Sequence, residues 1–108
     1  MASLGSARVR VVDPRKGQPT LVKCLIVHPM HSGDATDPKT GKKIPAHFIK
    51  KIYGEFNGQA VFEADWSVSI SRNPYLAYYF TPHESGELKM TWEDNQGGVF
   101  THEEKVSV

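Results

Sequence analysis

The sequence predicts an all-β protein: an immunoglobulin-like antiparallel β-sandwich of about seven strands in a single domain, 1–108, with an ordered core over about residues 7–106. Helical periodicity is almost absent, and short β-branched or aromatic runs alternate with turn signals at roughly ten-residue spacing. A chain of this length buries about two thirds of its unfolded surface without metals or disulfides. The antibody-type Cys–Trp–Cys pattern is missing, so the likeness is one of architecture.

The first two strands are expected at 8–12 (RVRVV) and 20–28 (TLVKCLIVH), separated by the turn DPRKG. Side chains alternate between the two faces of a strand. In the second strand this places Val22, Cys24, Ile26 and His28 on one face, and Leu21, Lys23, Leu25 and Val27 on the other. Because both faces carry apolar residues, this strand is predicted to lie inside its sheet.

Residues 29–46 are predicted to form a loop, with DPKTG as a tight turn. The strands at 47–56 and 59–66 then flank Asn57-Gly58, the strongest short signal for a β-hairpin. A two-residue turn pairs Tyr53 with Phe62 and Ile49 with Trp66. These pairs are predicted to form part of the inner wall.

Strands at 74–80, 87–94 and 99–106 complete the set, and 68–70 is a further short candidate. In 87–94, Leu88, Met90 and Trp92 alternate toward the core. In 74–80, alternation puts Tyr75, Ala77 and Tyr79 on one face and Leu76, Tyr78 and Phe80 on the other. One of these faces is expected in the core, and the other is aromatic enough for a protein interface, where tyrosine is enriched.

The charge balance and the missing motifs exclude several classes of function. Thirteen basic and twelve acidic residues give a net charge of +1, so there is no long-range field to attract nucleic acid or anionic lipid. No apolar run is long enough for a membrane span, and the start, MASLGSARVRVVDP, lacks a signal peptide, which by itself indicates the cytoplasm. No phosphate loop, His-Glu-x-x-His helix or nucleophile elbow is present, so no enzyme is expected.

The stretch VKCLIVHPMHSG, 22–33, gathers the residue types of a soft metal site. Within a strand, however, Cys24 and His28 lie about 13 Å apart at ~3.3 Å per residue, too far to share one metal. Cys24 is therefore predicted to be a small buried apolar residue. Two interpretations of His28 stay open: a strand-end side chain hydrogen-bonded to the loop, or part of a metal or ligand carrier site with Met30 and His31.

Several segments, in their order along the chain, resemble the SoxZ family: LIVHPMHSG, IPAHFIKKI, FNG, SRNPYLAYYF and MTWEDNQG. The resemblance runs from about residue 7 to 106. One departure concerns the loop after HPM, which in the family often reads roughly E-[ST]-G-x-R-K-D. Here it reads HSGDATDPKTGKK, so His31, Asp34 and Ala35 change its charge, and any docking of enzymes to this loop is expected to differ.

The resemblance implies a non-catalytic subunit without cofactors, metals or catalytic residues. Such a subunit forms a heterodimer with SoxY, whose C-terminal cysteine arm covalently carries sulfur intermediates during bacterial thiosulfate oxidation. The complex meets SoxAX, SoxB and, where present, SoxCD. This chain ends in THEEKVSV, without glycine or cysteine, as expected of the partner and not of the carrier. The family also implies the periplasm, reached by co-export with SoxY and without a signal peptide of its own.

The contact with SoxY is expected on the aromatic face around Asn73, Pro74, Tyr75 and Tyr79, together with the 28–33 loop and its His28 and Met30. This hypothesis rests on the aromatic alternation and on the positions of the matching segments. The alternative is that NPY is only a turn that leads into a core strand. Trp66 and Trp92 are expected in the core rather than in the contact.

Overall fold

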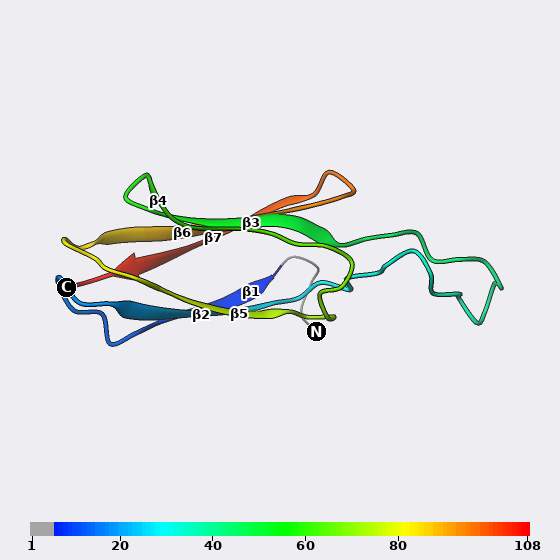
Figure 1. Ribbon diagram of the computed structural model, residues 1–108, viewed down its shortest axis with the longest axis horizontal. Helices are drawn as coiled ribbons and strands as arrows, with labels where there is room; N and C mark the ends of the chain where they lie inside the picture. Colours follow the sequence, from blue (N-terminus) through cyan, green and yellow to red (C-terminus); the bar gives the residue numbers. More distant parts are fainter. Residues whose placement is uncertain (1–5) are drawn as a thin grey trace.

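The computed structural model describes residues 6–108 and shows two antiparallel β-sheets packed face to face (Figure 1). The strands are β1 (Ala7–Val12), β2 (Thr20–Ile26), β3 (Ile49–Phe56), β4 (Gln59–Asp65), β5 (Tyr75–Phe80), β6 (Gly86–Asp94) and β7 (Val99–Val106). One sheet has the order β1-β2-β5 and the other β4-β3-β6-β7. The predicted all-β sandwich is confirmed. Within residues 6–108, no helix is long and apolar enough to cross a membrane.

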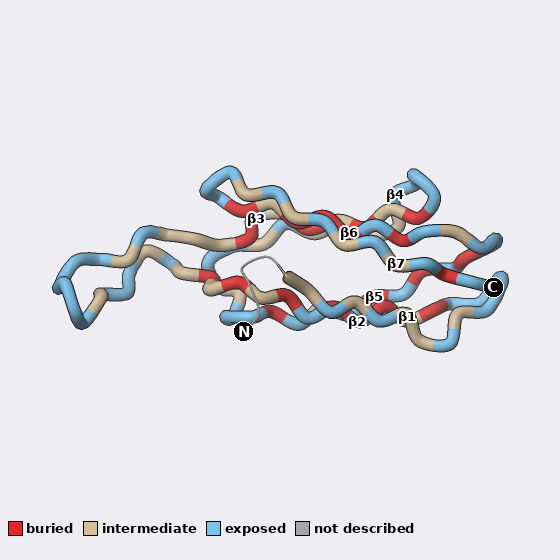
Figure 2. Tube along the Cα trace, turned by 180° about the vertical axis from the view of Figure 1, so that it is seen from behind, coloured by how far each residue is buried: buried red, intermediate tan, exposed pale blue. Residues whose placement is uncertain are grey.

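The core lies between the two sheets, where the buried stretches of the strands face each other (Figure 2). Leu88, Met90 and Trp92 point into it and are at most 1 % exposed, as their alternation predicted. The inner face of β2 supplies Val22, Cys24 and Ile26 from the opposite sheet. β2 lies between β1 and β5, which confirms its predicted central position.

The β3–β4 hairpin turns at Asn57-Gly58 as predicted, but the predicted register is wrong. Phe56 pairs with Gln59, and a bulge then shifts the register so that Gly54 pairs with Phe62 and Tyr53 with Glu63. The backbone N–H of Trp66 donates to the carbonyl of Lys50, the residue after Ile49. Trp66 therefore does not pair with Ile49. Tyr53 consequently lies on the outer face of the sheet.

The inner face of β3 has a glycine, Gly54, opposite side chains from both sheets. A Cβ on Gly54 would lie 2.8 Å from both the hydroxyl of Tyr78 and the sulfur of Met90. That hydroxyl donates to the Met90 sulfur at 2.9 Å, and the Tyr78 ring stacks on Phe62 with 4.3 Å between centroids. The small residue therefore makes room for the tyrosine that joins the two sheets.

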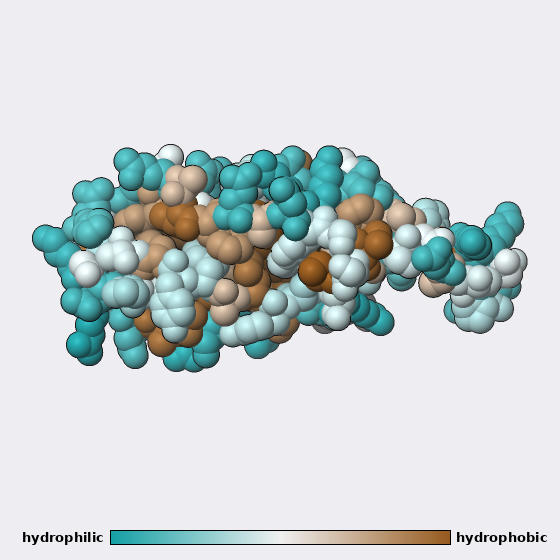
Figure 3. Space-filling view, viewed as in Figure 1, coloured by the Kyte–Doolittle hydropathy of each residue, from teal (hydrophilic) through white to brown (hydrophobic). Residues whose placement is uncertain are grey.

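One side of the sandwich is apolar between the sheets. Figure 3 shows a band of hydrophobic side chains that runs along the molecule between the two layers. β4, β5 and the segment between them contribute partly buried hydrophobic residues that pack against the core: Val61, Phe62, Ala64, Trp66, Ile70 and Leu76. The candidate strand at 68–70 is not formed, and those residues make a turn instead.

The loop between β2 and β3 projects from the end of the sandwich as a long, irregular hairpin (Figure 1). Isolated bridges link His31 to His47 and Thr36 to Lys43. The molecule measures 54 × 25 × 19 Å, with a radius of gyration of 15.8 Å. A compact domain of this length has about 13 Å. The projection thus explains the elongated shape, and it starts beside the cluster described next.

Candidate functional site

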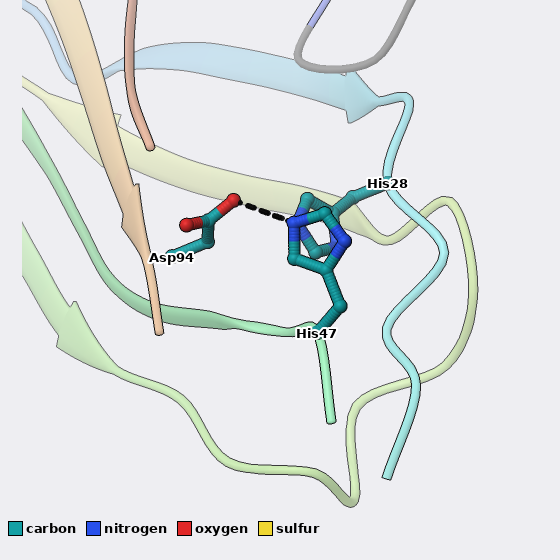
Figure 4. Close-up of side chains that lie close together, drawn as sticks. All are labelled: His28, His47 and Asp94. Carbon is teal, nitrogen blue, oxygen red and sulfur yellow. Dashed lines mark hydrogen bonds and ion pairs between the residues drawn. The ribbon is translucent and has the colours of Figure 1, made fainter. Parts of the chain in front are cut away.

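A cluster of two histidines and one aspartate lies at the base of the projecting hairpin (Figure 4). His28 follows β2, His47 precedes β3, and Asp94 ends β6. The Oδ2 atom of Asp94 lies 2.8 Å from Nε2 of His47 and 3.5 Å from Nε2 of His28. His28 and Asp94 are almost fully buried. The cluster therefore joins the three-stranded sheet to the four-stranded one at this end of the sandwich.

Asp94 is the centre of this network. Its Oδ1 atom accepts backbone N–H groups from Gly98 at 2.7 Å and Gln96 at 3.0 Å, which shapes the β6–β7 turn. Burial by itself would raise the pKa of Asp94, but the hydrogen bonds from His47, Gly98, Gln96 and His28 hold it below its ordinary value. Asp94 is thus an ionised carboxylate inside the protein, with donors on both of its oxygens.

His28 is oriented by the loop that follows it. Its Nδ1 atom accepts the backbone N–H of Met30 at 3.1 Å, and Met30 adopts a positive φ of 51°. A neutral imidazole has one donor and one acceptor nitrogen, so the proton of His28 sits on Nε2 and faces Asp94. Burial lowers the pKa of His28, which keeps the ring neutral. This confirms the interpretation as a strand-end side chain bonded to the loop.

The cluster also has the composition of a metal site, since two imidazoles and one carboxylate place their ligand atoms within 4.8 Å of one another. Coordination through Nε2 of His28 would need the lone pair of that nitrogen. The proton would then have to move to Nδ1, where it would point at the Met30 N–H. The hydrogen bonds therefore favour a structural network over a metal centre.

In the predicted trio of His28, Met30 and His31, two members are held by partners outside the trio. The Met30 sulfur accepts the backbone N–H of Ile49 at 3.3 Å, and His31 pairs through its backbone with His47. His47 and Asp94, which do join His28, were missed. Both lie in segments that the sequence had marked, IPAHFIKKI and MTWEDNQG, but only the fold brings those segments together.

The outer face of the three-stranded sheet is the second candidate region. Strand pairing arranges it in three rows, and we call it the aromatic face: Arg8, Leu25 and Tyr75; Arg10, Lys23 and Ala77; Val12, Leu21 and Tyr79. Tyr75 and Tyr79 are 60 % and 66 % exposed, and Leu25 is 45 % exposed. Tyr78 and Phe80, on the other side of β5, are buried. The two faces of β5 therefore separate into core and surface as alternation predicted.

The residues predicted for a partner contact divide into two groups. Tyr75 and Tyr79 lie on the aromatic face, and the exposed Asn73 lies at its end. His28, Met30 and Pro74 are buried, so their side chains offer no free surface. Asn73 also fixes the loop, because its Oδ1 accepts the His28 N–H at 3.0 Å and its own N–H donates to the His28 carbonyl at 2.8 Å. The contact itself stays a prediction.

Cys24 lies on the inner face of β2 with 1 % of its surface exposed. Burial raises the pKa of its thiol from 9.0 to about 12. The thiolate is the reactive form of cysteine, so the protein holds this side chain in an inert state. The prediction of a small buried residue is confirmed.

Comparison with known proteins identifies the family and the fold. The family described as "Sulphur oxidation protein SoxZ" matches residues 9–105. No curated protein matches the chain. Among solved structures, a superoxide reductase (neelaredoxin) from Ignicoccus hospitalis is similar at 15 % identity and a TM-score of 0.66, over 95 % of this chain and 80 % of that one.

Two further structures have the same architecture. A superoxide reductase from Nanoarchaeum equitans is 12 % identical with a TM-score of 0.65, over 94 % of this chain and 92 % of that one. A hypothetical protein from Pyrococcus horikoshii OT3 is 17 % identical with a TM-score of 0.61, over 94 % and 87 %. At such low identity the likeness shows the fold alone.

Proposed function

The chain belongs to the SoxZ family, and from that premise we propose that it is the non-catalytic subunit of a SoxYZ sulfur carrier. Its partner SoxY holds the sulfur intermediates of thiosulfate oxidation on a cysteine of its C-terminal arm. The subunit described here pairs with SoxY and helps present that arm to SoxAX, SoxB and, where present, SoxCD. The family match over residues 9–105 is the observation that carries this proposal.

The state of the single cysteine supports this division of labour. A thiol that accepts sulfur from one enzyme and delivers it to another must be exposed and ionisable. Cys24 is buried in the centre of a sheet, and the pKa of its thiol is about 12. The burial of Cys24 supports the part of the proposal that assigns the covalent chemistry to SoxY.

The aromatic face is the proposed contact with SoxY. Tyr75 pairs with Leu25 and Tyr79 with Leu21 on the neighbouring strand, so each exposed tyrosine has an aliphatic neighbour on this face. Tyrosine is enriched at protein interfaces because its ring is apolar and its hydroxyl can bond. Asn73 extends this surface toward the hairpin, and the rest of the 28–33 loop contributes through its backbone and through His31.

The proposed location is the periplasm. In the family the two subunits are exported together on the signal of SoxY, so this chain would reach the periplasm with its partner. The sequence-based indication of the cytoplasm came from the first residues alone, and the family assignment outweighs it.

A mild affinity purification of the tagged chain from its native cells tests the proposal. Intact-mass analysis should find a stoichiometric partner whose C-terminal cysteine carries extra sulfur mass. Purification of a chain without such a partner would contradict the proposal. A bound stoichiometric metal that is lost in a His28 or His31 variant would instead favour the metal or ligand carrier, for which Met30 was the third predicted ligand.

A further inference from the structure

The centre of the aromatic face carries positive charge that nothing on the face neutralises. Lys23 occupies the middle of the three-by-three array, and Arg10 lies directly beside it on β1. Arg8 occupies the next row along the same strand. The nine positions of the face contain no carboxylate. Of the ion pairs formed by residues 6–108, none includes these three cations.

Such an arrangement costs stability in the isolated chain. Side chains directly opposite each other on neighbouring strands have Cβ atoms about 5 Å apart, and like charges at this spacing repel. Arg10 and Lys23 form such a pair. A solvated face without a partner would be more stable with charges of opposite sign, so the unbalanced row points to carboxylates supplied from outside.

The same face has an apolar recess at its end. A notch of about 220 Å³ is lined by Ser6, Ala7, Arg8, Leu25 and Val27. It adjoins the first row of the array, where Arg8, Leu25 and Tyr75 lie side by side. The face therefore combines two exposed tyrosines, an apolar notch and a central cationic row. Apolar contacts that flank a row of charges of one sign are suited to a partner of the opposite sign.

A second copy of this chain is the wrong partner for this face. Symmetric dimers place the same patch of each subunit around a two-fold axis. Because Lys23 is central, such a pairing would set Lys23 against Lys23 and Arg10 close to both. Like charges brought together in an interface strongly disfavour the complex. The apolar groups alone would favour self-association, and the cationic row opposes it.

We propose that the row of Arg10 and Lys23 is a specificity device: it selects a partner surface with carboxylates at its centre and prevents the aromatic face from pairing with itself. The inference rests on the proposed function for the identity of the partner, the SoxY subunit. It goes beyond that function in assigning the charge of the partner's surface and in explaining why the complex is a heterodimer. The part that concerns self-pairing depends on this chain alone.

Two measurements on a charge-neutralised variant test the proposal. Arg10→Gln with Lys23→Gln should weaken binding of the partner subunit about tenfold at 50 mM salt, and should reduce the loss of affinity that the native chain shows between 50 and 300 mM. In sedimentation velocity without partner, the native chain should be monomeric at 50 mM salt. The variant should self-associate there, because the apolar groups are no longer opposed by charge.

Lys89→Gln with Lys105→Gln is the matched control, since both lysines are exposed on the other sheet. It should bind the partner as the native chain does and stay monomeric. Thermal melts establish that both variants are folded, and removal of two repelling exposed cations should not lower stability. If the Arg10 and Lys23 variant behaves like the control in both measurements, the inference is wrong. A native chain that binds no partner contradicts the proposed function instead, and sedimentation still decides the inference.

Discussion

The charged side chains are arranged differently on the two outer faces of the sandwich. On the four-stranded sheet, Lys51 lies between Asp65 and Glu93, and Lys89 lies between Glu55 and Glu103. Lys105 pairs with Glu87 in the same manner, and Lys51 forms an ion pair with Glu63 at 2.9 Å. On the three-stranded sheet, the charged neighbours have the same sign and the remaining positions are apolar or aromatic. Every charged side chain named on the first face lies beside one of opposite sign, so we call it the balanced face, although its six carboxylates outnumber its three lysines. The cations of the other face have no acidic neighbour among its nine positions.

The difference shows which surface is complete in the isolated chain. Cross-strand pairs of opposite charge stabilise a sheet surface that faces water. Exposed tyrosines and leucine beside cations without acidic neighbours make a surface less stable in water, because both the apolar area and the charges lack partners. The contrast supports the proposal that one face is turned to solvent and the other binds a partner. Of the four predictions that follow, those on the tyrosines and on Glu63 test it directly.

The largest expected effect is on the reactivity of a thiol, which should differ between the inner and outer faces of β2. The thiol of Cys24 should react with a disulfide reagent about a thousandfold more slowly in the native chain than in the unfolded one, because a pKa of about 12 in place of 9.0 leaves that much less thiolate. Lys23→Cys in a Cys24→Ala background moves the thiol to the outer face and should restore fast labelling. Rapid labelling of native Cys24 would show that the sheet opens readily.

The next prediction compares how tyrosines on the two outer faces contribute to partner affinity. Tyr75→Ala with Tyr79→Ala should weaken partner binding about a hundredfold, since two interface tyrosines that each contribute about 1.4 kcal/mol together give that factor. Both side chains are mostly exposed in the free chain, so the melting temperature should change little. The control is Tyr53→Ala on the balanced face, which should leave affinity unchanged in calorimetry. Unchanged affinity in the Tyr75 and Tyr79 variant would contradict the contact.

A smaller effect concerns the cluster that joins the two sheets. Because the pKa of His28 is lowered from 6.5, the unfolded chain binds a proton below that pH that the folded chain does not. The contribution of His28 to the free energy of unfolding should therefore be constant from pH 7 to 8 and should fall as the pH drops below about 6.5. Asp94, whose pKa is also lowered, adds a loss in the same direction below 3.8.

Thermal melts of His28→Gln between pH 8 and 5 check this. The variant should melt at a lower temperature, with a shallower dependence on pH than the native chain. His83→Gln removes an exposed histidine and should keep the native slope. Equal slopes in all three proteins would mean that His28 is protonated as easily in the fold as in the unfolded chain.

The smallest effect is expected from the balanced face itself. Glu63→Gln removes the ion pair with Lys51, in which both side chains are largely exposed. Exposed pairs contribute little, and Lys51 retains Asp65 and Glu93 as neighbours, so the melting temperature should stay within about 2 °C of native. Partner affinity should not change. A large drop in melting temperature would show that this ion pair matters for stability, and a large drop in partner affinity would show that this face takes part in the function.

Alternation within single strands was enough to predict much of the fold. It placed Leu88, Met90 and Trp92 in the core, and it separated Tyr75 and Tyr79 from Tyr78. The hairpin at Asn57-Gly58 followed from its turn residues. The register beyond that turn could not be predicted, because a bulge between Gly54 and Glu55 shifts it and no turn signal in the sequence marks that bulge.

The candidate site was less predictable, because its residues come from distant segments. His28 and Asp94 are separated by 66 positions, and His47 and Asp94 by 47. Nothing local indicates that these side chains meet. Arg8, Arg10 and Lys23 could be assigned to outer faces from alternation, but their proximity follows only from the strand order β1-β2-β5.

The outer face of the three-stranded sheet is net positive and that of the four-stranded sheet is net negative, so the molecule has an electric dipole across its thickness. An excess of about three elementary charges of each sign, separated by a sheet spacing of about 10 Å, corresponds to a moment on the order of 100 debye. A nearly neutral protein can therefore still turn in the field of a charged partner before the surfaces touch. Its positive side would then arrive first at an acidic partner, so orientation precedes contact even though the net charge is only +1.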